Sequence, residues 1–346
     1  VWLLDYNRRH GGRLIWLLVP LTALWANLHG GFFIFLVLLA LRTAACAGEA
    51  WVWPDIRPAR RSEVFQLVLL GAACGLASLV NPYGWHLHAH ILETLRSSWI
   101  TANVSEFKSP TFRTEEMYHF MVLLFAGLAL LPSLVRKKNL VEPLWILFLA
   151  YCSLTSVRHL TIYLLVATPI IAQELSTWWS EWVAGRSGAS LPAMLNDVSQ
   201  QLTSGLPGTS LFIPAVIVTL ACLPGLHWPQ EFPEAAVPAK MIERHAGLLA
   251  NGRVFASDQI ADYLIFRNYP SQRVFFDSRH NYYGEKIGND YLTIEEGQSK
   301  WRSVLDSYGF NLILTPVNSP ISSLAQAAGG WRVIENNSKY ILFERQ

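Results

Sequence analysis

The sequence predicts a polytopic α-helical membrane bundle followed by a small extracytoplasmic α/β domain. Of the 346 residues, 52% are hydrophobic and only 15% are charged, which is typical of membrane proteins. Long apolar runs extend as far as Leu226, whereas the remainder alternates short strand-like and helical segments. We therefore expect a transmembrane domain over residues 1–226 and a soluble domain over residues 227–346.

Seven apolar runs are candidate membrane crossings. A straight helix needs about 20 apolar residues to cross the bilayer, and several runs are shorter. The fifth and sixth runs are the weakest: they form either two short helices meeting at Arg158-His159 or a re-entrant hairpin. The seven runs are Leu14–Leu28, Phe32–Ala45, Val64–Val80, Met117–Val135, Pro143–Val157, Leu160–Gln173 and Leu211–Pro224.

The basic residues predict how these crossings are oriented. Lys and Arg are enriched in cytoplasmic loops. One set of loops is rich in them, so the alternate set, together with the C-terminal domain, is expected on the outer side of a bacterial inner membrane. The rich set contains Arg8, Arg9, Arg13, Arg42, Arg57, Arg60, Arg61, Arg136, Lys137, Lys138 and Arg186, and the poor set contains Arg96, Lys108, Arg113 and Arg158.

Four polar motifs all fall on that outer side of the threading. Polar residues at membrane depth are costly and usually serve a site or a buried pairing network. Clustering on one side therefore predicts a membrane-embedded site that opens to one compartment. The motifs are Leu24–Gly31, Asn81–Trp85, Glu106–Pro110 and Arg158-His159.

The first two motifs allow both a structural and a functional interpretation. Asn27 and His29 either orient a polar headgroup or belong to a tight hairpin whose glycines permit close packing. Asn81 and Tyr83 follow a predicted helix end, where they are either substrate contacts or simply turn residues.

The largest outer loop contains a histidine cluster and an acidic residue. His86 and His90 would share a helix face and could bind a metal, but no carboxylate is fixed beside them, so we favour a solvated or interfacial cluster with His88 and predict no metal site. Glu106 allows several interpretations. It could act as a general base or hold a divalent cation, or it could merely pair with Lys108 or be solvated.

Arg158 and His159 interrupt an apolar stretch near the outer face. Arg recognises phosphate through a planar, bidentate guanidinium, and His adds a donor or a titratable group. The alternative is an Arg that extends to the interface without binding anything. Because this Arg departs from the positive-inside trend, we favour phosphate binding.

The soluble part has the pattern of an α/β domain. Asp277 and Arg279 follow its second predicted strand, where they form either a ligand site or, as we favour, a local ion pair that fixes the turn. The expected strands are Gly252–Ala256, Arg273–Phe276, Phe310–Thr315, Trp331–Glu335 and Tyr340–Glu344, the last two joined by a hairpin turn; the expected helices are Asp258–Phe266, capped by its Asp, Ser299–Tyr308 and Ser319–Ala328.

Several functional classes find no support in the sequence. A net charge of +2 without a basic stripe gives no indication of nucleic-acid binding. The soluble part has no P-loop, no dinucleotide fingerprint and no Gly-x-Ser-x-Gly. The four cysteines lie in apolar stretches without metal-type spacing. Because the chain opens in membrane-flanking sequence without Met, we expect it to be the C-terminal part of a longer protein.

Taken together, the motifs resemble a bacterial family of polytopic proteins related to the GT-C membrane glycosyltransferases. The similarity covers nearly the whole chain, but the family usually has Gly where this chain has Ser278. The matching segments are Trp25–Gly31, Asn81–Gly84, Glu106-Phe107, Ser109-Pro110, Arg158-His159, Gly252–Phe255, Asp262–Ile265, Arg273–Arg279 and Trp331–Val333.

The resemblance implies transfer of a sugar from a polyprenyl-phosphate carrier, on the outer side, to an unknown glycan, lipid or protein acceptor. In this interpretation Glu106 and His29 are catalytic, and the carrier and its sugar are bound by Asn27, Asn81, Tyr83, Arg158 and His159. The key acidic residue of such enzymes normally lies in a first outer loop, which we expect in the part of the protein that precedes this sequence. The alternatives are a non-enzymatic envelope transporter or assembly factor, and a scaffold derived from the family.

Overall fold

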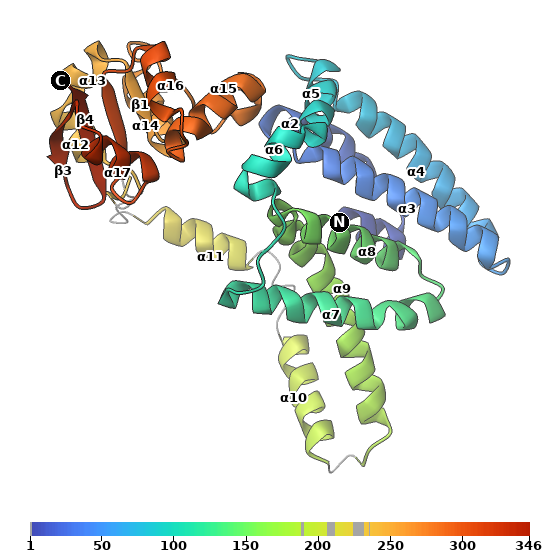
Figure 1. Cartoon of the computed structure of the whole chain (residues 1–346). Coiled ribbons are helices and arrows are strands. Elements are labelled where there is room, and N and C mark those ends of the chain that lie inside the picture. The colour runs from blue at the N-terminus through green and yellow to red at the C-terminus, as the bar shows by residue number, and fades with distance from the viewer. Residues whose placement is uncertain (1, 188–189, 206–211, 224–231, 235) are drawn as a thin grey trace. The chain divides into compact units, whose positions relative to one another are not determined.

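The chain forms two compact units, Val1–Gly208 and Thr209–Gln346, in a computed structural model (Figure 1). The structure describes residues 2–187, 190–205, 212–223, 232–234 and 236–346. The expected boundary at residues 226 and 227 lies outside the described residues. Each unit has its own hydrophobic core, so each is described by itself.

The described residues of the first unit form helices joined by loops, without a strand. Its core packs α3, α4, α7, α8 and α9 around side chains such as Leu39, Leu70, Ile146 and Tyr163. Its helices are α1 (Trp2–His10), α2 (Leu18–Leu28), α3 (Phe32–Val52), α4 (Arg57–Ala77), α5 (His86–Arg96), α6 (Ser98–Asn103), α7 (Glu115–Arg136), α8 (Val141–Thr155), α9 (Leu160–Ala184) and α10 (Leu191–Gly205), with short 3-10 helices η1 (Leu14–Leu17), η2 (Ser105–Phe107) and η3 (Val157–His159).

Three helical segments of the described residues are long and apolar enough to cross a membrane: Phe32–Val52, Met117–Arg136 and Val157–Ala184. The expected seven crossings are not supported. Leu14–Leu28 and Val141–Thr155 are apolar but short, and α4 opens with the charged segment Arg57–Glu63. The last expected run, Leu211–Pro224, contains only the ten-residue α11 (Phe212–Ala221). The first and last residues of that run lie outside the described residues. The structure thus favours a membrane protein by helix length and composition alone.

Contacts between helices fix their relative directions. The Leu140 backbone N–H donates to Glu49 Oε1 at 2.7 Å, and Trp145 Nε1 donates to the Leu38 carbonyl at 2.9 Å. Later residues of α8 therefore contact earlier residues of α3, so the two helices are antiparallel. Figure 1 shows α3 beside α4, its partner in the core.

The α7 and α9 helices instead run in the same direction. Tyr163 Oη donates to the Leu123 carbonyl at 3.1 Å, and Lys137 Nζ donates to Glu174 Oε1 at 2.8 Å. A Cβ on Gly127 would lie 2.6 Å from Tyr163 Oη, so only glycine permits this approach. α8 connects α7 to α9 and runs in the opposite direction to both. The end of α8 and the start of α9 therefore lie at the same end of the unit.

These directions bring the four sequence motifs to one end of the unit. At this end, which we call the motif end, α2, α4 and α8 finish and α3, α7 and α9 begin. At the other end, which we call the basic end, lie Glu49, Arg60, Lys137, Lys138 and Glu174. The one-sided clustering expected from the sequence is therefore present in the helical packing.

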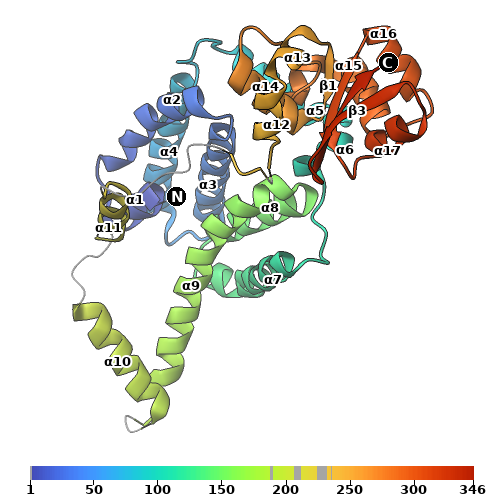
Figure 2. The same ribbon diagram turned by 90° about the vertical axis from the view of Figure 1, so that its left-hand side faces the viewer.

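The second unit contains a four-stranded mixed sheet of order β1-β2-β4-β3 (Figure 2). β1 is parallel to β2, and the other pairs are antiparallel. β1, β2 and β4 are buried almost throughout, as expected of strands covered by helices on both faces, whereas β3 is a more exposed edge. The strands are β1 (Val254–Ala256), β2 (Leu312–Pro316), β3 (Trp331–Asn336) and β4 (Tyr340–Arg345).

Strand alternation divides the core between the two faces of the sheet. Val254, Ala256 and Leu314 share one cluster with α12, α13 and α14. Phe255 points the other way, where its ring lies 5.8 Å from those of Tyr291 and Phe310. The helices of this unit are α11, α12 (Ala239–Arg244), α13 (Ala246–Asn251), α14 (Asp258–Asn268), α15 (His280–Glu295), α16 (Trp301–Tyr308) and α17 (Pro320–Ala327).

Two expectations for the soluble part are wrong, and one helix was not predicted. The expected strand Arg273–Phe276 is irregular, because its aromatic side chains pack beside the sheet while its backbone joins no strand. The N-cap of α14 is Ser257, and Asp258 is the first residue of the helix. The long α15 was not expected, because only Gly288, Tyr291 and Ile294 mark its buried face. The expected closing hairpin is confirmed as β3 and β4.

Candidate functional site at the motif end of the helical unit

Arg158 and Glu106 form the centre of the candidate site. Arg158 Nη1 lies 3.4 Å from Glu106 Oε1, and the Arg158 guanidinium carbon lies 4.5 Å from the centroid of the Phe107 ring. The Arg158 side chain is 34% exposed and that of Glu106 is 56% exposed. The guanidinium is thus held between a ring and a carboxylate while part of it still faces outward.

Backbone contacts hold this pair in register. Ser156 Oγ donates to the Glu106 carbonyl at 2.9 Å, and the Val157 N–H donates to the Lys108 carbonyl at 3.0 Å. These bonds join η2, which precedes α7, to η3, which separates α8 from α9. Two of the sequence motifs therefore form one structure, with a half-buried His159 next to Arg158.

Asn27 lies at a second junction of the motif end. Its Nδ2 donates to the Val80 carbonyl at 2.6 Å and to the Ala23 carbonyl at 2.8 Å. The amide therefore ties the end of α2 to the chain beyond α4. His29 follows, and its Nδ1 accepts from the Gly31 N–H at 2.8 Å, which closes the turn into α3.

Asn81 is likewise engaged with backbone. Its Nδ2 donates to the carbonyls of Ser78 and Gly84 at 2.9 and 3.2 Å, and its Oδ1 accepts from the Tyr83 N–H at 2.8 Å. The Tyr83 side chain is 69% exposed. The amide groups of Asn27 and Asn81 thus shape the turns, and Tyr83 is the group here that faces outward.

The three histidines of α5 do not form a metal centre. His88 Nε2 lies 2.9 Å from Ser78 Oγ, and its ring packs edge-on to Phe32 at 5.3 Å. His88 therefore belongs to the packing of α5 against the helical unit. Across the described residues, no group of three or more His, Cys, Asp or Glu side chains could hold a metal ion.

An ion network at the basic end was missed by sequence reasoning. Arg42 was assigned to a cytoplasmic loop, but it lies inside α3 and is 1% exposed. Its Nη2 donates to Glu63 Oε1 at 2.7 Å, Arg60 also pairs with Glu63, and Arg60 Nε lies 2.6 Å from Glu49 Oε2. The spacing of Arg42 and Glu49 by seven residues on one helix face was the available signal. The network joins α3 to α4, so we assign it a structural role.

In the second unit, Asp277 and Arg279 form the local ion pair favoured from the sequence. The fully buried Asp277 carboxylate accepts from Arg279 Nη2 and from Tyr283 Oη, each at 2.6 Å. Burial alone would raise the pKa of Asp277, but these hydrogen bonds hold that pKa below its ordinary value. The pair fixes the turn into α15.

A buried polar cluster lies where the parallel strands end, and the sequence analysis did not identify it. Ser257 Oγ donates to Glu295 Oε1 at 2.9 Å and lies 3.2 Å from Thr315 Oγ1, which in turn lies 2.9 Å from Ser319 Oγ. Burial raises the pKa of Glu295 to about 7. Ser257 directly follows one predicted strand and Thr315 ends another, but nothing in the sequence brings Glu295 to them.

Comparison with known proteins does not add a family assignment. No protein-family model matches the chain, and no curated protein matches it. The site must therefore be interpreted from its own geometry.

Proposed function

We propose that the helical unit is the membrane part of a GT-C-like glycosyltransferase, which takes a sugar from a polyprenyl-phosphate donor on the extracytoplasmic face of a bacterial inner membrane. The observation that carries the proposal is the joining of Arg158 to Glu106 at the motif end. A partly exposed guanidinium is suited to phosphate, and the carboxylate beside it is suited to a proton.

The proposed reaction assigns each of these groups a role. Arg158 binds the donor phosphate, and His159 adds a hydrogen-bond donor. Glu106 accepts the proton of the acceptor hydroxyl, while the oxygen of that hydroxyl forms a bond to the anomeric carbon of the sugar. The bond between that carbon and the phosphate oxygen breaks, and its electron pair leaves with the polyprenyl phosphate, whose charge Arg158 stabilises.

A groove between α3 and α4 supports the choice of a lipid-linked donor. Its volume is about 500 Å³. Ala40 and Ala44 carry only a methyl group and Gly71 and Gly75 carry no side chain, so these residues leave room between the two helices. Leu36 and Leu39 add apolar walls. Thr43 is the polar residue of the lining, and its hydroxyl is satisfied by the Leu39 carbonyl at 2.9 Å. Such a surface suits an isoprenoid chain.

A non-catalytic scaffold or assembly factor of the cell envelope is the second candidate. The observation that favours it is the use of Asn27, His29 and Asn81 in turns, where their polar atoms bond to backbone. In that case Arg158 and Glu106 would also be a structural pair. The two candidates differ in whether the motif end binds a lipid phosphate.

Native mass spectrometry in mild detergent separates the two candidates. Under the glycosyltransferase proposal, the chain retains polyprenyl phosphate, Arg158→Ala loses it, and Arg113→Ala retains it as a matched control from the same outer loops. Glu106→Gln retains the lipid but loses sugar transfer. Folded wild-type protein without lipid would favour the scaffold, and retention of lipid by Arg158→Ala would remove the phosphate role of this residue.

A further inference from the structure

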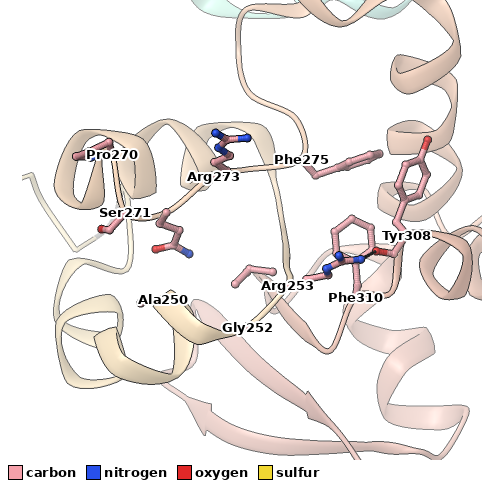
Figure 3. A pocket seen from close by; sticks show the side chains of 11 residues that line it. Ala250, Gly252, Arg253, Pro270, Ser271, Arg273, Phe275, Tyr308 and Phe310 are labelled. Carbon is pink, nitrogen blue, oxygen red and sulfur yellow. Dashed lines mark hydrogen bonds between the residues drawn. The ribbon is translucent and has the colours of Figure 1, made fainter.

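A pocket of the second unit lies at the amino ends of β1 and β2 (Figure 3). Its volume is about 400 Å³, within the range of small-molecule sites. Its walls come from the chain before β1, the segment 270–275 after α14, and the end of α16. It lies away from the Ser257–Glu295 cluster, which is at the carboxyl ends of the same strands.

Two arginines are the charged residues of the pocket lining. Arg253 Nη1 donates to the Tyr308 carbonyl at 3.1 Å, which is its one side-chain hydrogen bond to the described residues. The Arg273 guanidinium makes no hydrogen bond or ion pair with any residue that the structure describes. Since no Asp or Glu lines the pocket, these guanidinium groups leave it positively charged and able to bind an anion.

Three aromatic side chains gather at one end of the pocket, with the Arg253 guanidinium among them (Figure 3). The Phe275 ring lies 4.6 Å from that of Tyr308 and 5.2 Å from that of Phe310. Tyr308 Oη donates to Asp290 Oδ2 at 2.7 Å, which fixes its ring. This end therefore offers a preorganised apolar wall beside a cation.

The segment that carries Arg273 is also held in place. The buried Gln272 donates through Nε2 to the Leu249 carbonyl at 3.2 Å and accepts from Asn268 Nδ2 at 2.6 Å. These bonds tie the segment to α13 and to the end of α14. Arg273 is thus presented from a fixed backbone, although its own guanidinium is unpaired among the described residues.

We infer that this pocket binds an anionic saccharide, with its phosphate or carboxylate at Arg273 and its sugar ring against Phe275 and Tyr308, beside Arg253. Sugar rings present apolar C–H faces that pack on aromatic rings, and guanidinium groups bind either anion bidentately. Nucleotides fit less well, because the chain has no glycine-rich phosphate loop at this pocket. The inference does not rest on the proposed transferase, since every residue in it belongs to the second unit.

Titration calorimetry on the full chain in detergent tests the inference. The probes are glucose 1-phosphate, glucuronate, neutral glucose, inorganic phosphate and adenosine monophosphate. Glucose 1-phosphate and glucuronate should bind, each about tenfold or more tighter than glucose. Binding of phosphate as tight as that of glucose 1-phosphate, or tighter binding of the nucleotide, would overturn a saccharide site.

Substitutions locate the binding. Arg273→Ala should weaken glucose 1-phosphate about tenfold or more, and it should fold normally because no described residue bonds to its guanidinium. Arg253→Lys, which keeps the charge but loses the fork, should weaken it less. Arg267→Ala is the matched control, since Arg267 is an exposed arginine of the same unit outside the pocket. Equal binding by Arg273→Ala and the control would contradict the assignment, whatever Arg158→Ala does to lipid retention.

Discussion

Arg158 Nη1 approaches Glu106 Oε1 to 3.4 Å, although 52 residues separate the two in sequence. Both side chains are partly exposed, and exposed ion pairs contribute at most about 1 kcal/mol. The register of η2 against η3 depends instead on the Ser156 hydroxyl and the Val157 N–H, which donate to the backbone carbonyls of Glu106 and Lys108. The pair is therefore available for chemistry without being needed for folding.

This relationship predicts that Arg158→Ala and Glu106→Ala each change the free energy of unfolding by less than about 1 kcal/mol. Ser156→Ala should cost more than either, because it leaves the Glu106 carbonyl without its donor. Thermal unfolding in detergent, followed by tryptophan fluorescence, measures all three. If Arg158→Ala is the least stable of them, the pair is a structural element and the proposed phosphate role loses its basis.

The pairing of Arg158 with Glu106 also marks the limit of sequence reasoning. Hydrophobic runs and basic loops predicted that both residues lie on one side of the membrane, and the helix directions place both at the motif end of the helical unit. The contact itself depends on how α7, α8 and α9 fold back on each other, and no local pattern encodes that return. The same holds for Glu295, which reaches Ser257 and Thr315 only through the packing of α15.

Errors in the fold have comparable physical causes. The expected number of crossings followed from apolar composition, but among the described residues only three helices have both the length and the apolar composition of a span. Arg273–Phe276 has the composition of a strand, yet its aromatic residues are used in side-chain packing beside the sheet. The sheet strands were predicted well, because three of them are short, apolar and bounded by turn residues.

Asn27 tests whether the motif end depends on its turns. Its Nδ2 donates to two backbone carbonyls, so Asn27→Asp places carboxylate oxygens against carbonyl oxygens. We expect Asn27→Asp to lower the free energy of unfolding by about 1–3 kcal/mol and Asn27→Ala by about 1 kcal/mol. Chemical unfolding in detergent gives the order. If both variants are as stable as the wild-type protein, the amide does not tie α2 to Val80.

The ion network at the basic end predicts a strong effect of removing one partner. Arg42 is buried, so Arg42→Ala leaves Glu63 partly desolvated with Arg60 as its remaining cation. We expect Arg42→Ala to lower the free energy of unfolding by about 3 kcal/mol. Replacing both Arg42 and Glu63 by Met should recover most of that loss. Arg61→Ala, at an exposed arginine of α4, serves as the control. If Arg42→Ala unfolds at the same temperature as Arg61→Ala, the network contributes nothing to the stability of the fold.

Glu295 makes the stability of the second unit depend on pH. Burial raises its pKa from 4.5 to about 7 in the folded chain, although the hydrogen bond from Ser257 opposes the shift. The folded state holds the Glu295 proton more tightly than the unfolded state. The contribution of this proton to the free energy of unfolding is therefore fully present below pH 4.5. It is lost as the pH rises through about 7, for a total on the order of 3 kcal/mol.

Glu295→Gln removes this dependence, because the amide keeps an acceptor for Ser257 Oγ and cannot ionise. We expect the variant to match the wild-type protein at pH 4 and to be more stable than it at pH 8. Hydrogen exchange of peptides covering β1 and β2 follows this unit separately from the helical one. Glu285→Gln, at an exposed position of the same helix, should show no such crossover. If Glu295→Gln is instead less stable at pH 8, the carboxylate is ionised in the folded protein and its charge is compensated.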